Sequence, residues 1–223
     1  MEKLPAWSYS SMKTFDQCPR KYYHLKVVKD VKEDISNTLY GTELHKACEE
    51  YVRDDKPLSS QFAYVKSALD NLKTRPGKIL CEYKMGLTED LQPCEFFASD
   101  VWWRGVIDLL IIDEETGTAR VVDYKTGKST KYADTGQLEL MALAVFKHFP
   151  KVVKVKAGLL FVVAKAFPKA NYAIDDQPKL WEKWLGEWKK MEVAYKRDVW
   201  NAKPSGLCKK HCPVLSCAYN RRA

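Results

Sequence analysis

The chain has 223 residues, of which 46% are hydrophobic and 30% are charged, so it can bury a sizeable core and is not generally disordered. Its length fits one domain or two small ones, and its formal net charge of +8 favours a polyanionic partner. The longest wholly apolar run, Ala157 to Ala164, is far shorter than the about 20 residues that span a membrane. The first residues carry no apolar signal core. We therefore expect a cytoplasmic location (the host cytoplasm for a phage-encoded protein) and no membrane partner.

The expected elements change in type along the chain. Serines from Ser8 onward can cap a short helix that runs towards Cys18. Further helices are expected over about 39–53, 59–72, 135–148 and 177–200. Strands are expected over 78–87, 95–99, 101–112, 119–125 and 152–164, where β-branched and aromatic residues are frequent. This order predicts a mixed α/β fold, with a central mixed sheet flanked by helices. We expect a single domain, 1–223, with an N-terminal segment 1–38, a core 39–200 and a C-terminal cysteine-bearing segment 201–223.

Two of the expected strands each carry an acid among apolar residues. Asp108 interrupts the first, and Asp123 followed by Lys125 interrupts the second. The loop 114–117 between them ends in glycine and suits a hairpin. If Asp113 pairs with Thr118, Asp108 lies opposite Asp123, with Cβ atoms about 4.5–5.5 Å apart. Lys125 shares the face of Asp123, because strand side chains repeat every two residues.

Two carboxylates so close repel each other unless a positive charge neutralises them. Mg²⁺ or Mn²⁺ suits this role, because such ions combine protein carboxylates with water and a substrate phosphate. Lys125 could orient the attacking water or stabilise charge on the phosphate oxygens. The alternative is a salt-bridge triad on a solvated strand face, which the apolar flanking residues argue against.

His45, in the expected helix 39–53, offers an imidazole that a transition metal accepts as a ligand. Outside such a site, a lone histidine is more often a structural residue. Glu82 is a candidate for a carboxylate that contacts the metal ligands rather than the metal itself. The alternative is a surface acid at the end of a strand.

This ordered set of residues closely resembles the RecB-like branch of the PD-(D/E)xK nucleases. It comprises Gly41-x3-His45, Gly105-x2-Asp108, Asp123-x-Lys125 and Gln137, and the resemblance extends from Ser8 to Cys217. The resemblance implies a restriction-endonuclease-like core. It also implies that His45, Asp108, Asp123 and the carbonyl of Tyr124 bind the metal, and that Lys125 is catalytic. Gln137 would contact the site or the DNA, although Met141 stands where the family motif has a tyrosine.

The cysteines suggest a second metal centre. Cys208, Cys212 and Cys217 are clustered and Cys18 is remote, which together make the four thiols needed by a 4Fe-4S cluster or a structural Zn²⁺. The alternative is a buried Cys18 with free cysteines in the tail. The resemblance to CRISPR-associated and AddB-type exonucleases implies an iron–sulfur cluster. The C-x3-C spacing departs from their C-x2-C, which leaves zinc open, with His211 as a replacement ligand.

The resemblance implies a metal-dependent DNA exonuclease acting on single-stranded 5′ ends in recombination, repair or replication, with proteins of those pathways as partners. The alternatives are a structure-specific endonuclease and a non-catalytic subunit of a recombination or CRISPR-adaptation complex. Candidate DNA contacts are Lys128 and Lys131 beside the site, and Arg20 and Tyr22 near Cys18.

Overall fold

The computed structural model describes residues 4–33, 39–131 and 133–220. The chain forms two compact units: Thr38–Trp181, which holds the sheet, and a unit made of Met1–Asn37 with Glu182–Ala223. Helix α6 (Gln177–Arg197) begins in the first unit and continues in the second. The expectation of one domain with boundaries at 38 and 200 stays a prediction.

Six strands form one mixed sheet in the order β2-β1-β3-β4-β5-β6. They are β1 (Lys78–Leu87), β2 (Pro93–Cys94), β3 (Trp103–Asp113), β4 (Thr118–Lys125), β5 (Lys154–Phe161) and β6 (Lys169–Ala173). β4 and β5 are parallel, and the other neighbouring pairs are antiparallel. Helix α5 (Gly136–His148) lies between β4 and β5 in the chain, as expected because parallel strands need a crossover connection.

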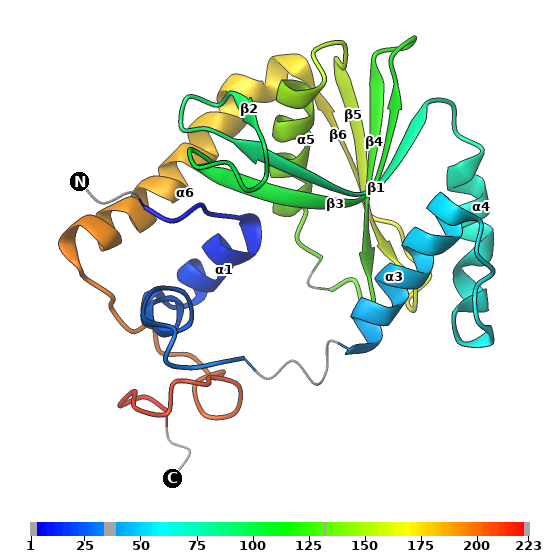
Figure 1. Ribbon diagram of the computed structural model, residues 1–223. Coiled ribbons are helices and arrows are strands. Elements are labelled where there is room, and N and C mark those ends of the chain that lie inside the picture. The colour runs from blue at the N-terminus through cyan, green and yellow to red at the C-terminus, as the bar shows by residue number, and fades with distance from the viewer. Residues whose placement is uncertain (1–3, 34–38, 132, 221–223) are drawn as a thin grey trace. The chain divides into compact units, whose positions relative to one another are not determined.

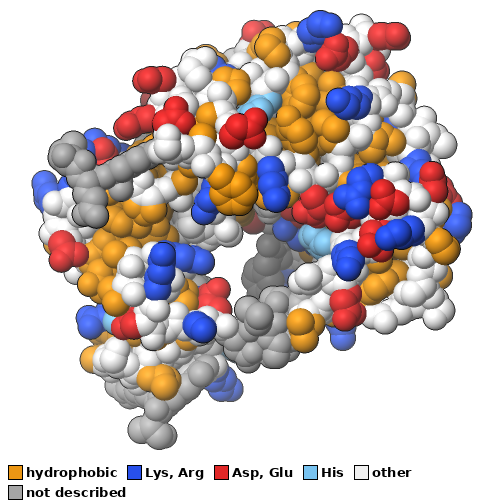
Figure 2. Space-filling model, in the orientation of Figure 1, with side chains coloured by type: hydrophobic (Ala, Val, Ile, Leu, Met, Phe, Trp, Pro, Cys, Tyr) orange, Lys and Arg blue, Asp and Glu red, His pale blue; other side chains and the backbone are white. Residues whose placement is uncertain are grey.

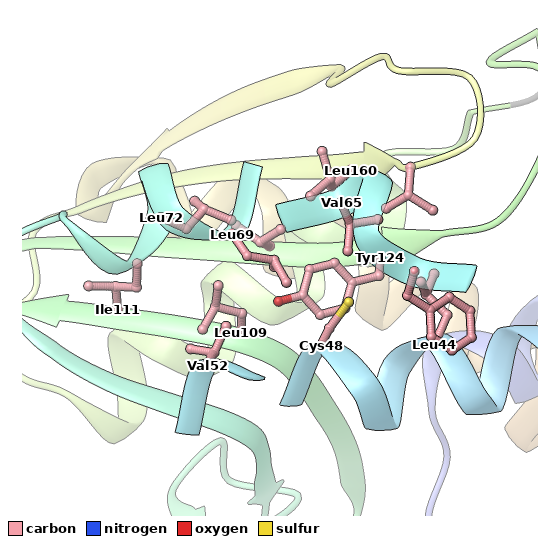
Figure 3. Packing of buried hydrophobic residues seen from close by; sticks show 13 residues of the cluster. Leu44, Cys48, Val52, Val65, Leu69, Leu72, Leu109, Ile111, Tyr124 and Leu160 are labelled. Carbon is pink, nitrogen blue, oxygen red and sulfur yellow. The ribbon is translucent and has the colours of Figure 1, made fainter. Parts of the chain in front are cut away.

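Helices cover both faces of this sheet (Figure 1). Helices α3 (Leu39–Asp54) and α4 (Lys66–Lys73), the latter preceded by the 3-10 helix η3 (Ser60–Val65), lie on one side, and α5 lies on the other. A buried cluster joins α3 and α4 to the sheet, and Figure 3 shows Leu44 and Cys48 of α3 beside Tyr124 of β4. The predicted mixed sheet flanked by helices is therefore confirmed.

The β3–β4 hairpin has the predicted register. Asp113 pairs with Thr118, and the loop between the strands is 114–117. Gly117 has a φ of +62°, in the left-handed region that glycine adopts without steric cost. The turn therefore fixes which residues of the two strands lie opposite each other.

The structure differs from the predicted elements of the sheet at several places: β2 was not predicted, and β5 is shorter than the predicted strand 152–164. The segment 95–99 is not a strand but a turn, in which Ala98 donates a backbone hydrogen bond to Glu95 and Phe97 is 76% exposed. Its aromatic residues give the segment the composition of a strand, but the segment belongs to the connection from β2 to β3. Strand β6 was not predicted, because its sequence, KANYA, is short and polar.

The other unit contains helices α1 (Tyr9–Gln17) and α2 (Pro19–Tyr22), the π-helix η1 (Tyr23–Val28) and most of α6. The predicted serine cap of α1 is present: Ser8 and Ser11 form a reciprocal capping box. Trp7 stacks on Trp188 of α6 with ring centroids 5.7 Å apart, so the N-terminal segment packs on α6 within this unit. Within the described ranges, no helix combines the length and the apolar character needed to cross a bilayer.

Candidate metal-dependent active site

Three carboxylates lie in one row across β1, β3 and β4. The β1–β3 register, read from the pairs on both sides of Glu82, places Glu82 opposite Asp108. The β3–β4 register, continued one residue past its last pair (Leu109 with Val122), places Asp108 opposite Asp123. Glu82 has a φ of +48°, a conformation rare for residues other than glycine and frequent at functional sites. The sheet therefore brings three acids to one place.

Two of these acids are largely buried. Asp108 is 8% exposed and Asp123 is 3% exposed. The backbone N–H of Tyr124 donates a 2.7 Å hydrogen bond to Asp108 Oδ2, which partly compensates for the loss of water. Since a buried carboxylate is costly without a partner of opposite charge, the row favours binding of a cation.

His45 approaches the same carboxylate from α3. Its neighbour Leu44 is fully buried in the cluster beneath the helix, which anchors this turn of α3 on the sheet. His45 Nδ1 lies 3.4 Å from Asp108 Oδ2, and Nε2 lies 3.1 Å from the carbonyl oxygen of Tyr124. Both ring nitrogens thus face oxygen acceptors, an arrangement that favours the doubly protonated ring.

A closed set of polar contacts holds Lys125 beside Asp123. Lys125 Nζ lies 2.7 Å from Asp123 Oδ2 and donates a 3.1 Å hydrogen bond to Gln137 Oε1. The amide nitrogen of Gln137, in the first turn of α5, donates to Asp123 Oδ1 at 2.8 Å. Gln137 therefore orients both the carboxylate and the ammonium group.

The pKa values of the site reflect an excess of negative charge. Burial, followed by the charge of Asp108, raises the pKa of Glu82 and of Asp123, although Lys125 lowers that of Asp123. Burial alone would lower the pKa of His45, but the hydrogen bond and charge of Asp108, with Asp123 and Glu82, raise it. Without a metal ion, the site therefore tends to bind protons, which neutralise its negative charge as a bound cation would.

His45, Glu82 and Asp108 can bind one metal ion, because one ligand atom from each lies within 4.8 Å of the others. Two carboxylates and an imidazole suit Mn²⁺, and the carboxylates suit Mg²⁺. From the sequence, Glu82 was expected to contact the metal ligands rather than the metal itself. The structure instead groups it with His45 and Asp108. Asp123 lies outside this group and contacts Lys125 and Gln137 instead. Figure 2 shows acidic and basic side chains interspersed on the face of the sheet-containing unit that it displays.

The candidate DNA contacts differ in exposure. Lys128 and Lys131, which follow β4, are exposed, and so is Arg20. Tyr22 is only 3% exposed, its hydroxyl lies 2.9 Å from that of Tyr195, and its ring stacks on Trp200. A ring buried in this way offers no surface to a base, so the expectation that Tyr22 contacts DNA is wrong for this structure.

The predicted cysteines meet in one pocket of the unit formed by the chain ends, whose lining includes Cys18, Cys208, Cys212 and Cys217. The backbone N–H groups of Lys21 and Lys203 point at Cys18 Sγ, at 3.5 and 3.4 Å. Among the residues that the structure describes, no three thiols lie within 4.8 Å of one another. They are therefore not arranged as closely as four thiolates around a single zinc ion.

Comparisons with known proteins identify the family. No curated protein matches the chain. Among the solved structures, the crystal structure of SSO0001 is similar with a TM-score of 0.47 and 13% sequence identity, over 98% of this chain and 88% of that chain. The family model described as the PD-(D/E)XK nuclease superfamily matches residues 6–217, nearly the whole chain. The protein therefore belongs to the PD-(D/E)XK nuclease superfamily.

Proposed function

We propose that this nuclease is a metal-dependent DNA exonuclease of the RecB-like branch. It acts from single-stranded 5′ ends in recombination, repair or replication. The observation that carries the proposal is the row of Glu82, Asp108 and Asp123, with His45 beside Asp108 and Lys125 beside Asp123. A protein that only bound nucleic acid would have no use for three carboxylates facing a phosphate.

In this proposal His45, Glu82, Asp108, Asp123 and the Tyr124 carbonyl hold Mg²⁺ or Mn²⁺. The bound ion supplies Lewis-acid polarisation of the phosphate and lowers the pKa of an attacking water. Lys125 donates hydrogen bonds to the non-bridging phosphate oxygens, where negative charge accumulates in the transition state. Gln137 forms hydrogen bonds with both the Lys125 ammonium group and the Asp123 carboxylate, and so holds the two groups in fixed positions.

The proposal is tested by digesting end-labelled single- and double-stranded oligonucleotides with Mg²⁺ or Mn²⁺. We expect release of short products from 5′ ends of single strands, and none from a circular single strand. Asp108→Ala and Lys125→Ala should abolish cleavage but retain DNA binding, whereas the control Asp90→Ala, an exposed acid in the turn after β1, should cleave normally. Cleavage of the circle would identify an endonuclease. Unchanged cleavage by both site variants would overturn the site.

We also propose that Cys18, Cys208, Cys212 and Cys217 bind a 4Fe-4S cluster. Their meeting in one pocket supports this, because each thiolate of such a cluster binds a different iron atom and the thiols stay further apart than around one zinc ion. Backbone N–H groups directed at Cys18 Sγ are the kind of contact that stabilises a cluster-bound sulfur. We expect protein purified without oxygen to be brown and to contain four iron atoms. A colourless protein with stoichiometric zinc would contradict the cluster and leave the nuclease proposal intact.

A further inference from the structure

We infer that a pocket beside the carboxylate site holds one nucleobase of the substrate strand. The inference rests on the proposed function only in taking single-stranded DNA as the ligand. The pocket lies between η3–α4 and the segment that follows β5, and its volume is about 460 Å³. Ligand pockets in proteins typically measure about 300–1,000 Å³. The space is therefore sufficient for a base.

The pocket adjoins the active-site strand. Phe161, which lines it, pairs with Lys125 in the parallel β4–β5 ladder, so the two backbones lie about 4.8 Å apart. The next lining residue, Val162, donates a 3.0 Å backbone hydrogen bond to the carbonyl of Lys125. Lys125 and Phe161 are the last residues of β4 and β5, so a single strand whose phosphate lies at Lys125 can pass the end of the sheet from the α5 side to the α4 side, where the pocket lies.

The walls of the pocket suit a base rather than a charged group. They include the aromatic residues Tyr64 and Phe167, which are not buried, and apolar residues such as Leu72 and Leu160. Figure 3 shows Val65 and Leu160, which both line the pocket, together at one side of the buried cluster. Proteins that bind single strands combine such aromatic surfaces with positive charge, because every base has a face on which a ring can stack.

The positively charged residues around the pocket favour a polyanionic ligand. Lys165 is the one ionisable residue other than tyrosine among the described lining residues, and it is exposed. Lys169 lies with Nζ 5.2 Å from the centre of the Phe167 ring. The exposed Lys128 follows Lys125 by three residues. An anionic backbone can thus pass from the carboxylate row to Lys165 without meeting an acid in the pocket wall.

The test compares binding of single-stranded oligonucleotides of equal length that carry one abasic nucleotide at successive positions from the end. Binding to the full-length protein is measured without divalent metal, so that cleavage plays no part. At one position, loss of the base should weaken binding of the wild type about 5- to 150-fold, the range typical of one stacked base. In Ala68→Phe, which fills the pocket from α4, the same abasic change should have no effect, because the base is already excluded.

Two further variants keep the test decisive. Phe167→Ala removes a ring from the wall and should also abolish the abasic effect. The control Ala63→Phe places the same bulk at an exposed residue of η3 that does not line the pocket, and it should behave as wild type. Thermal unfolding checks that each variant is folded.

The inference is overturned if no position shows an abasic effect, or if the effect is equal in wild type and Ala68→Phe. A dimer that Ala68→Phe dissociates, with no abasic effect, would assign the pocket to a second copy of the chain and also overturn it. Absence of metal-dependent cleavage by the wild type would instead contradict the proposed function. Because binding is measured without metal, the two failures are distinguishable.

Discussion

The amide nitrogen of Gln137 donates a 2.8 Å hydrogen bond to Asp123 Oδ1. The oxygen of the same amide accepts from Lys125 Nζ, so one side chain of α5 holds two groups of the site. We predict that Gln137→Ala lowers the cleavage rate about 10- to 100-fold, as is typical when a partner of a metal-site residue is removed. Thermal unfolding should change little. Lys147→Ala, in the last turn of the same helix, is the control and should retain full activity.

Glu82 should contribute directly to metal affinity. We predict that Glu82→Gln raises the Mn²⁺ concentration needed for half-maximal cleavage by about tenfold or more, because one anionic ligand is lost. Calorimetric titration of Mn²⁺ without DNA should show the same weakening. The exposed Glu89 of the following turn provides the matched control Glu89→Gln. Equal metal affinity in Glu82→Gln and wild type would place Glu82 outside the ligand set.

Neutralising Asp123 should stabilise the metal-free fold. Burial and the nearby Asp108 raise the pKa of Asp123, so its ionised form is less favourable in the folded protein than in the unfolded chain. We predict that Asp123→Asn increases the free energy of unfolding at pH 8 by on the order of 1–2 kcal/mol in the presence of a chelator. Activity should nevertheless be lost. Denaturant unfolding and cleavage assays measure the two effects separately.

The pH dependence of this stabilisation follows from the direction of the pKa shift. The folded protein binds the Asp123 proton more tightly than the unfolded chain, so the wild type gains stability as pH falls through the raised pKa. The advantage of Asp123→Asn should therefore be complete above that pKa. It should shrink as pH falls towards 3.8, the ordinary pKa of an aspartate. An advantage that stays constant from pH 8 to pH 4 would contradict the assignment of the shift to Asp123.

The exposed lysines after β4 should bind phosphates. We predict that replacing both Lys128 and Lys131 by alanine weakens binding of single strands of every sequence and reduces the slope of log affinity against log salt by about two. Lys151→Ala is the control: Lys151 is exposed and pairs with Glu114 in the β3–β4 turn. A salt slope equal to that of the wild type would exclude the two lysines from the DNA interface.

The burial of Tyr22 leads to the opposite expectation for DNA binding. Tyr22→Phe removes its hydrogen bond to Tyr195, which should cost about 0.5–1.5 kcal/mol of stability. Affinity for single-stranded DNA should not change, since the ring keeps its packing against Trp200. Weaker DNA binding at unchanged stability would restore Tyr22 as a contact residue.

The sequence predicted the parts of the site that local geometry determines. A four-residue turn sets the register of β3 and β4, which places Asp108 opposite Asp123 when it is continued past its last pair, and the two-residue strand period places Lys125 beside Asp123. Glu82 could not be placed in the same way, because fifteen residues separate β1 from β3 and no turn sets their register. Tyr22 was expected to contact DNA because an aromatic residue among charged residues is typical of an exposed binding surface. Its partners, Tyr195 and Trp200, come from the other end of the chain.

The β3–β4 turn has a consequence for how such a protein can vary. Its first two residues, Glu114 and Glu115, are exposed, and Glu114 makes a surface ion pair with Lys151, so substitution of these side chains should cost little stability. The number of residues in the turn is not free to change, since a one-residue slip of the pairing would carry Asp123 and Lys125 to the opposite face of the sheet. This surface turn thus tolerates substitution but not a slip caused by insertion or deletion, and related chains should differ there in sequence rather than in length.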